Sequence, residues 1–528
     1  MLTPKEAGAN RVAPTICAHS ALFDGMADGL SRTFATAGNT RQGTIAFWVK
    51  KADAAVVDTN PHLVSAESGP GFTRFVLPWS GYEERFELRH RLTDGATLYC
   101  HCWSFAMADE TGHSHVCLCW DTEQPEAADR FRLWVNGCAL PFSSIGADVP
   151  RYTDLNLFGA CLHNMLAYRG PGYYSDVHFI DGLALEADSF GESSPPGDLQ
   201  WVPREYAGAY GPNGFHLDFD DAADPGRDAS GNGNDLAVAG SPLQTLDTPA
   251  NNYCTINPHA TSTTAVSGGN RVGTGVAGSS YYESWPFTFT LGQGKWWFRT
   301  ALTWTENAAP NFSLYALSEY WDSHGGYYPS NAFHLLRTTE YLLAGEWRPA
   351  LIPSFNIESG SLLDILLDFD GGAFSVFDDG LLLGTIDISS ILGSGPFILA
   401  WDDLRNEETG YTAVELDFGA TGATPPAGYE DYLPICAANL PDGQLDVLSG
   451  AYLGNGTADG PFVWSNCALA SVTIGTETYA NDGTDGTVRF HAAGFKLVDD
   501  AAHNARLTTY PWTATKKSIF KYSNAQEG

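Results

Sequence analysis

Alternating apolar segments early in the chain twice end in a dipeptide that favours tight turns. The first covers residues 115–121 and leads through a polar loop to residues 130–137, which end in Asn-Gly; the second covers residues 176–182 and ends in Asp-Gly. Period-two alternation places every second side chain on one face of a strand, and these dipeptides favour antiparallel hairpins. The pattern therefore predicts an all-β fold of antiparallel sheets.

Further alternating segments extend this prediction along the chain. In the first half we expect strands at residues 20–23, 44–51, 73–77, 85–91, 97–105, 114–120, 130–135, 175–180 and 236–238. In the second half we expect strands near residues 294–299, 364–371, 373–380, 383–386, 396–400, 415–419, 462–464, 472–474, 487–491, 495–498 and 518–522. No segment has the length and periodicity of a long helix.

The chain of 528 residues is longer than one hydrophobic core usually serves, so several domains are expected. Stretches rich in Pro, Gly and Ser mark the boundaries. The predicted organisation is a leader (1–19), a first β-sandwich (20–250), a linker (251–280), a second β-sandwich (281–422), a linker (423–441) and a small C-terminal β domain (442–528).

The charge is strongly acidic, with 62 Asp and Glu against 28 Lys and Arg and a net charge of −34. Such a surface repels nucleic acid and anionic membranes, so neither is expected as a partner. No apolar run approaches the roughly 20 residues that span a bilayer, and the first residues lack the apolar stretch of a signal peptide. We therefore expect synthesis in a cytoplasm and no membrane insertion.

Several segments resemble known recognition folds. Residues 44–51, 115–121, 131–137 and 176–182 resemble a laminin-G/concanavalin-like domain. Residues 295–298, the Asp-Gly turns at 368–371 and 379–380, residues 383–385 and residues 396–397 are similar to a SPRY-like domain. These resemblances imply tandem antiparallel β-sandwiches of the jelly-roll kind.

The order of the connecting segments resembles large bacteriophage virion proteins of the tail-fibre or surface-fibre kind. The segments are residues 32–39, 179–182, 189–192, 228–235, 251–258 and 436–441. The resemblance implies a location on the virion surface, other tail or capsid proteins as partners, a homotrimer, and recognition of host-surface glycan or protein. Two alternatives stay open: a purely structural fibre or decoration subunit, and a glycan-cleaving tailspike.

Aromatic side chains in loops are the candidate ligand-binding residues, because sugars stack on exposed rings. Tyr320, Trp321, Tyr327 and Tyr328 lie in one segment with short polar residues between them. The same rings would equally suit burial against a neighbouring subunit. Further rings expected to be exposed in loops are Tyr173, Tyr174 and Trp285.

An Asx-rich turn at residues 228–235 is the candidate calcium site. Asp228, Asn232 and Asp235 offer oxygen ligands at short spacing, with glycines that permit tight curvature. The alternative is a turn whose side chains satisfy its own backbone. No other cofactor is expected.

Ten cysteines occur in the chain, and the simplest interpretation is reduced, buried thiols. Cys100 and Cys102, with Cys117 and Cys119, would form a zinc site only if their two strands were paired. Structural zinc sites usually place two cysteines three positions apart on a turn, a spacing that is absent here.

The sequence contains no complete catalytic motif that we recognise, so we expect no enzyme activity. Glu415 and Asp417 alternate as in glycosidase strands, but the following residues are Gly and Ala where a second glutamate is needed. Nucleophile-elbow, phosphate-loop and zinc-protease motifs are absent from the sequence.

Overall fold

The structure is a computed structural model of the whole chain. The residues that it describes are 16–52, 61–77, 85–104, 112–140, 143–144, 147–168, 170–193, 201–257, 265–275, 282–305, 310–316, 332–336, 340–344, 346–349, 359–395, 397–404, 412–440, 447–453, 459–464, 469–474, 477–480, 488–491, 494–498 and 509–516. The chain divides into two compact units, residues 1–252 with 522–528 and residues 253–521.

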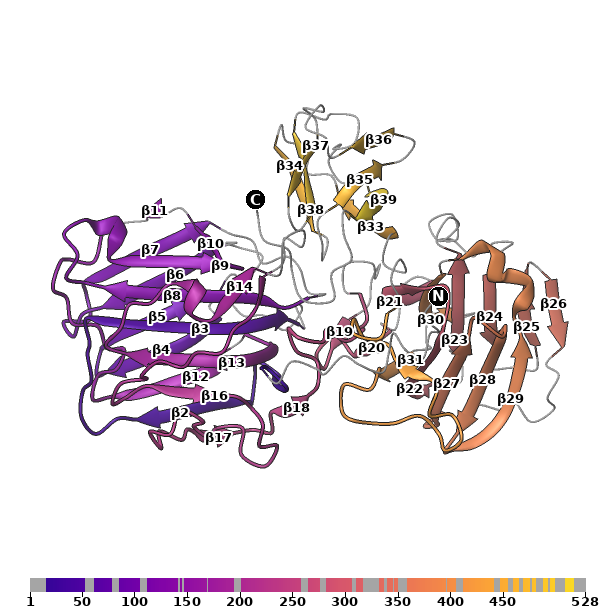
Figure 1. The fold of residues 1–528 in the computed structure, drawn as a ribbon, viewed down its shortest axis with the longest axis horizontal. Helices are drawn as coiled ribbons and strands as arrows, with labels where there is room; N and C mark the ends of the chain where they lie inside the picture. The colour runs from indigo at the N-terminus through magenta and orange to yellow at the C-terminus, as the bar shows by residue number, and fades with distance from the viewer. Residues whose placement is uncertain are drawn as a thin grey trace. The chain divides into compact units, whose positions relative to one another are not determined.

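The first unit is a sandwich of two eight-stranded antiparallel sheets (Figure 1). Sheet A has the strand order β10-β9-β8-β3-β13-β1-β18, with β16 paired to β13; sheet B has the order β11-β7-β6-β5-β4-β12-β2-β17. The strands of sheet A are β1 (Ser20–Phe23), β3 (Gln42–Lys51), β8 (Ser114–Asp121), β9 (Phe131–Val135), β10 (Cys138–Ala139), β13 (Gly172–Asp181), β16 (Phe215–Leu217) and β18 (Leu243–Thr245). Those of sheet B are β2 (Gly29–Thr33), β4 (His62–Ser68), β5 (Gly71–Val76), β6 (Arg85–Arg91), β7 (Leu98–Ser104), β11 (Ser143–Ser144), β12 (Leu162–Tyr168) and β17 (Ala237–Ala239).

Sheet A is buried on both faces. On β3, Ile45 and Phe47 belong to the core between the two sheets, whereas Ala46 and Trp48 belong to a second cluster on the outer face. Trp201 joins this outer cluster, and it comes from a small two-stranded sheet of β14 (Gly191–Ser193) and β15 (Trp201–Pro203). The chain after β13 thus covers the outer face of sheet A. Short 3-10 helices, η2 (Ala127–Asp129) and η3 (Ala187–Ser189), lie in the connections.

One of the two predicted hairpins is confirmed and the other is wrong. β8 pairs with β9, and β9 turns through Asn136 and Gly137 into β10, with positive φ at both turn residues as a type I′ turn requires. After Asp181-Gly182 the chain forms no hairpin with β13. The Asp181 carboxylate instead accepts hydrogen bonds from the backbone N–H groups of Asn39 and Asn213, and so joins two loops.

A buried ion cluster fixes the last residues of the first unit. Lys50 Nζ lies 2.8 Å from Asp247 Oδ2 and 2.9 Å from Asn252 Oδ1, and His113 Nε2 lies 3.0 Å from Asp247 Oδ1. The side chains of Lys50, His113 and Asp247 are at most 1% exposed. Because charges this deeply buried require partners, residues 247–252 belong to the fold of this sandwich.

The second unit contains an eight-stranded and a six-stranded sheet. The first has the order β19-β20-β31-β22-β27-β28-β29 with β32 paired to β22, and the other has the order β21-β30-β23-β24-β25-β26. The strands are β19 (Ala265–Ser267), β20 (Val272–Thr274), β21 (Tyr282–Leu291), β22 (Lys295–Trp304), β23 (Pro310–Ala316), β24 (Ala332–Leu336), β25 (Glu340–Leu343), β26 (Glu346–Pro349), β27 (Leu362–Asp368), β28 (Ala373–Asp378), β29 (Leu381–Asp387), β30 (Phe397–Leu404), β31 (Thr412–Asp417) and β32 (Leu433–Pro434), with the 3-10 helix η5 (Ser389–Ser394). Edge, stacked and tilted ring contacts connect Phe287, Phe298, Phe312, Phe374 and Trp401 in its core.

Strands also occur where we expected linkers. β19 and β20 lie within residues 251–280 and pair into the eight-stranded sheet, and β32 lies within residues 423–441 and pairs with β22. We predicted linkers from the Ser, Thr, Gly and Pro content of these segments, and such a composition does not exclude short edge strands.

The C-terminal segment forms two small antiparallel sheets, of order β33-β39-β35-β36 and β34-β38-β37. Their strands are β33 (Val447–Leu453), β34 (Asp459–Trp464), β35 (Leu469–Ile474), β36 (Glu477–Ala480), β37 (Val488–His491), β38 (Gly494–Val498) and β39 (Thr509–Lys516). The strand expected at residues 518–522 lies outside the described residues. The all-β prediction is confirmed, and no helix in the described part of the chain has the length and hydrophobicity of a membrane span.

Candidate functional site

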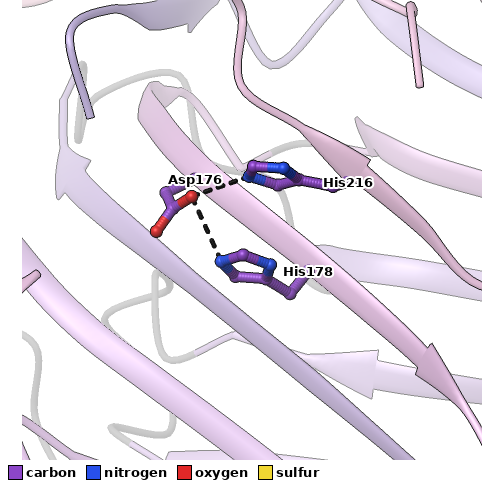
Figure 2. A group of neighbouring side chains, drawn as sticks. All are labelled: Asp176, His178 and His216. Atoms are coloured by element: carbon purple, nitrogen blue, oxygen red, sulfur yellow. Dashed lines mark hydrogen bonds and ion pairs between the residues drawn. The ribbon is translucent and has the colours of Figure 1, made fainter. Parts of the chain in front are cut away.

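Asp176, His178 and His216 meet on the outer face of sheet A (Figure 2). Asp176 Oδ1 lies 2.7 Å from His216 Nε2 and 3.1 Å from His178 Nε2. One ligand-type atom from each residue falls within 4.8 Å of the other two. Within the described ranges, this is the one group of three or more His, Cys, Asp or Glu side chains with the spacing of a metal site.

A β-bulge in β13 creates this arrangement. Ser175 pairs with Trp48 and His178 pairs with Ala46, so β13 has one more residue than β3 between these pairs. Asp176 has a φ of 48°, the left-handed conformation that an aspartate adopts at moderate cost. The extra residue reverses the alternation, so that Val177 faces the core and His178 faces outward.

The neighbouring strand supplies the third side chain by register. His216 of β16 is the direct partner of His178, and both flanking residues, Phe215 and Leu217, belong to the core. The two imidazole rings therefore stack, with centroids 4.4 Å apart and an interplanar angle of 7°.

Tyr210 and Cys17 surround the three residues. Tyr210 Oη lies 2.9 Å from His178 Nδ1, so it orients the ring through the nitrogen that points away from Asp176. Burial raises the pKa of the Cys17 thiol, and the adjacent Asp176 carboxylate raises that pKa further. Cys17 is 9% exposed and belongs to the outer cluster, against which Tyr210 also packs.

Electrostatics keep the aspartate ionised. Burial alone raises the pKa of Asp176, but His178 and His216 beside it outweigh burial and hold that pKa below its usual range. Burial lowers the pKa of His178, and Asp176 opposes the shift only in part. An ionised carboxylate with buried imidazole nitrogens is a donor set that divalent transition metals bind.

A second feature of the first sandwich is a polar pocket of about 350 Å³. It is lined by Cys119, Asp121, Gln124, Asp129, Arg132 and Ala184. Gln124 Nε2 donates to Asp121 Oδ2 at 2.7 Å, and the Arg132 guanidinium lies over the Trp134 ring at 5.2 Å. The pocket therefore presents carboxylate, amide and guanidinium groups, and these contacts hold Gln124 and Arg132 in place.

The predicted calcium turn is held by hydrogen bonds to its own backbone and to the backbone of residues 211–216. Asp228 Oδ1 accepts from the N–H groups of His216 and Ser230, and Asp228 Oδ2 accepts from Asn234 N–H. Asp235 Oδ1 accepts from Asp228 N–H, and Asn232 Nδ2 donates to two backbone carbonyls. These backbone contacts account for the Asx-rich sequence of the turn, and calcium binding here stays a prediction.

The aromatic predictions have two outcomes. Tyr320, Trp321, Tyr327 and Tyr328 lie outside the described residues. Three other rings were expected to be exposed, and this was wrong: Tyr173, Tyr174 and Trp285 are at most 1% exposed. They belong to strands β13 and β21 and not to loops, and both faces of these strands are packed.

Strand pairing does not assemble the cysteines into a zinc site. Cys100 and Cys102 lie on β7 in sheet B, whereas Cys117 and Cys119 lie on β8 in sheet A and pack into the outer cluster. Cys117 and Cys119 form no disulfide, which agrees with the prediction of buried thiols.

The two carboxylates of the glycosidase-like strand lie on β31. Glu415 is exposed, and Asp417 Oδ1 accepts a hydrogen bond from Gly419 N–H at 2.9 Å. Asp417 thus stabilises the turn that follows the strand.

Sequence analysis did not single out Asp176, His178 or His216. The available signals were a histidine two positions after an aspartate on one predicted strand and a histidine between two apolar residues on another. The sequence does not reveal that these strands are neighbours with His178 opposite His216.

No protein-family model and no curated protein matches the chain. Solved structures similar to it include the SPRY domain of human HERC1, with 12% identity over 30% of this chain and 96% of that domain and a TM-score of 0.25. A heptameric SAP-like pentraxin from Limulus polyphemus is 15% identical over 33% of this chain and 80% of its own, with a TM-score of 0.22. The TRIM65 PSpry domain is 14% identical over 31% of this chain and 89% of its own, with a TM-score of 0.23. The assignment of the fold rests on the sheets described above.

Proposed function

We propose that the protein is a non-catalytic recognition component of a bacteriophage surface or tail fibre that binds a host-surface glycan or protein. The observation that carries the recognition role is the polar pocket of about 350 Å³ in the first sandwich. Ligand pockets usually begin near 300 Å³, so this one has room for a sugar unit. The virion setting and the homotrimer rest on the resemblance of the connecting segments.

The pocket suits a neutral, hydroxyl-rich ligand. Asp121, Asp129 and Gln124 offer acceptors, and Arg132 and Gln124 offer donors, so hydroxyl groups find both kinds of partner. The net charge of −34 disfavours polyanionic ligands in general. A neutral bacterial polysaccharide is therefore the ligand to test first.

The test is binding of the purified full chain to an array of bacterial surface polysaccharides. Asp129 is exposed at the pocket, so Asp129→Ala removes an acceptor without disturbing the core, and we expect about tenfold weaker binding. Asp224→Ala, at an exposed aspartate that does not line the pocket, is the matched control and should bind as the unaltered chain does.

Two results would contradict the proposal. Absence of binding to glycans and to host cells, together with capture by other virion proteins, would favour the purely structural fibre. Release of shortened glycan would favour the tailspike, and loss of that release in Glu415→Ala would assign it to β31.

A further inference from the structure

The geometry of the outer face of sheet A points to a metal site. We propose that Asp176, His178 and His216 bind one divalent transition-metal ion of the zinc type. This site is separate from the polar pocket, with which it shares no residue.

The spacing of the three side chains fits such an ion. Zinc holds nitrogen and oxygen ligands at about 2.0–2.1 Å, so the ligand atoms of a tetrahedral site lie about 3.3 Å apart. The two Asp176–histidine separations are 2.7 and 3.1 Å, and all three ligand atoms fall within 4.8 Å. Because the two imidazole rings are stacked and both Nε2 atoms face Asp176 Oδ1, the side chains must rotate to direct all three ligand atoms at one ion.

His178 provides an independent observation. Its ring is buried, and Nε2 has no hydrogen-bond partner although it lies 3.1 Å from the Asp176 carboxylate. An imidazole nitrogen buried in this way is costly unless something binds it. A metal ion at the centre of the three residues would accept its lone pair.

The second nitrogen of His178 is already held as a metal-binding histidine requires. Nδ1 faces Tyr210 Oη at 2.9 Å, and with a proton on Nδ1 the lone pair of Nε2 points toward Asp176. Ligating histidines usually donate their other ring nitrogen to such a partner, which fixes the tautomer and the orientation of the ring.

The three ligands come from two neighbouring strands. Catalytic-type zinc sites with three protein ligands take a water molecule as the fourth ligand. The ion would then link β16 to β13.

The experiment uses the untagged full chain, because an affinity tag of histidines would itself bind metal. The chain is stripped with a chelator and titrated with Zn²⁺, with elemental analysis and thermal unfolding as the measurements. We expect one equivalent of zinc and a higher melting temperature. A chain that retains no zinc and shows no thermal shift overturns the proposal.

Variants assign the ligands. Loss of an outer-shell partner weakens metal binding by about 10–100-fold. His216→Gln removes a ligand, at the most exposed of the three residues, so it should weaken zinc binding by more than this range. Tyr210→Phe should fall within that range. His19→Gln is the control, because His19 pairs with Asp220 and is not one of the proposed ligands, so zinc affinity should be unchanged. Zinc binding that survives His216→Gln unchanged overturns the assignment.

Cobalt tests the composition of the ligand set. With Co²⁺ in place of zinc, a thiolate ligand gives a charge-transfer absorption in the near ultraviolet that nitrogen and oxygen ligands do not give. We expect no such band, because the proposed ligands are a carboxylate and two imidazoles. A cobalt complex with the band would refute this ligand set. Neither outcome depends on glycan binding.

Discussion

At the scale of single residues, the first sandwich uses buried histidines in place of apolar side chains. His163 is 1% exposed, and its Nε2 accepts from Phe158 N–H while its Nδ1 donates to the carbonyl of Cys161. Both nitrogens are satisfied only in the neutral form, because the backbone N–H occupies the lone pair that a proton would need. Burial lowers the pKa of His163 to about 4, although the backbone contacts oppose this in part.

This histidine predicts an acid-sensitive fold. The pKa of His163 is about 4 when folded and 6.5 when unfolded, so the unfolded chain binds more protons between these values. Stability is therefore full above pH 6.5 and decreases as the pH falls toward 4, by up to about 3 kcal/mol from this residue. Urea unfolding of the unaltered chain and of His163→Gln at pH 7.5, 6 and 5 measures the effect.

The variant separates the contribution of His163 from that of other groups. His163→Gln should lower the unfolding free energy at pH 7.5 and show a shallower decrease toward pH 5. Equal pH dependence in the two proteins would mean that His163 is not the residue that binds the proton.

At the scale of elements, the two-residue turns are the parts that local sequence specifies most directly. Asn136-Gly137 joins β9 to β10, and Asp379-Gly380 joins β28 to β29, each with positive φ at both residues. The surroundings of the two glycines differ. A Cβ on Gly137 would lie 2.5 Å from the Trp201 ring, whereas one on Gly380 would meet nothing within 4 Å.

These turns form a matched pair for substitution. Gly380→Ala should cost about 1 kcal/mol, the cost of a left-handed alanine. Gly137→Ala should cost about 2–3 kcal/mol, because the Trp201 ring must also shift within a packed cluster. Denaturant unfolding of the two variants measures both costs. Equal costs would contradict the close approach of Trp201.

The sequence predicted elements well where alternation is regular and poorly where it is not. The segments that became β3, β6 and β8 alternate clearly and were predicted nearly to the residue. β12 was missed because its buried positions include His163, a polar residue that breaks the apolar pattern. The candidate metal site was missed because it depends on the bulge at Asp176 and on the pairing of β16 with β13, which are tertiary features.

At the scale of the whole molecule, the boundary near residue 250 is a prediction from composition, and the first compact unit runs to residue 252. Composition could not indicate why the boundary falls there. Asp247 lies beyond the last strand of the first unit, and its contacts with buried Lys50 and His113 tie this part of the chain to the first sandwich. Burial raises the pKa of Asp247, but Lys50 and His113 outweigh it, so this pKa is lowered and the carboxylate stays ionised.

The ion cluster predicts where the first unit can be cut. A fragment of residues 1–252 keeps Asp247 and should unfold in one cooperative transition. A fragment of residues 1–241 loses β18 and Asp247, so that Lys50 keeps a buried charge without this carboxylate, which costs about 3–5 kcal/mol. Circular dichroism during urea unfolding of both fragments measures the difference. Equal midpoints would show that the boundary does not depend on Asp247, since the loss of a buried counter-ion must lower the midpoint if the cluster holds the segment in place.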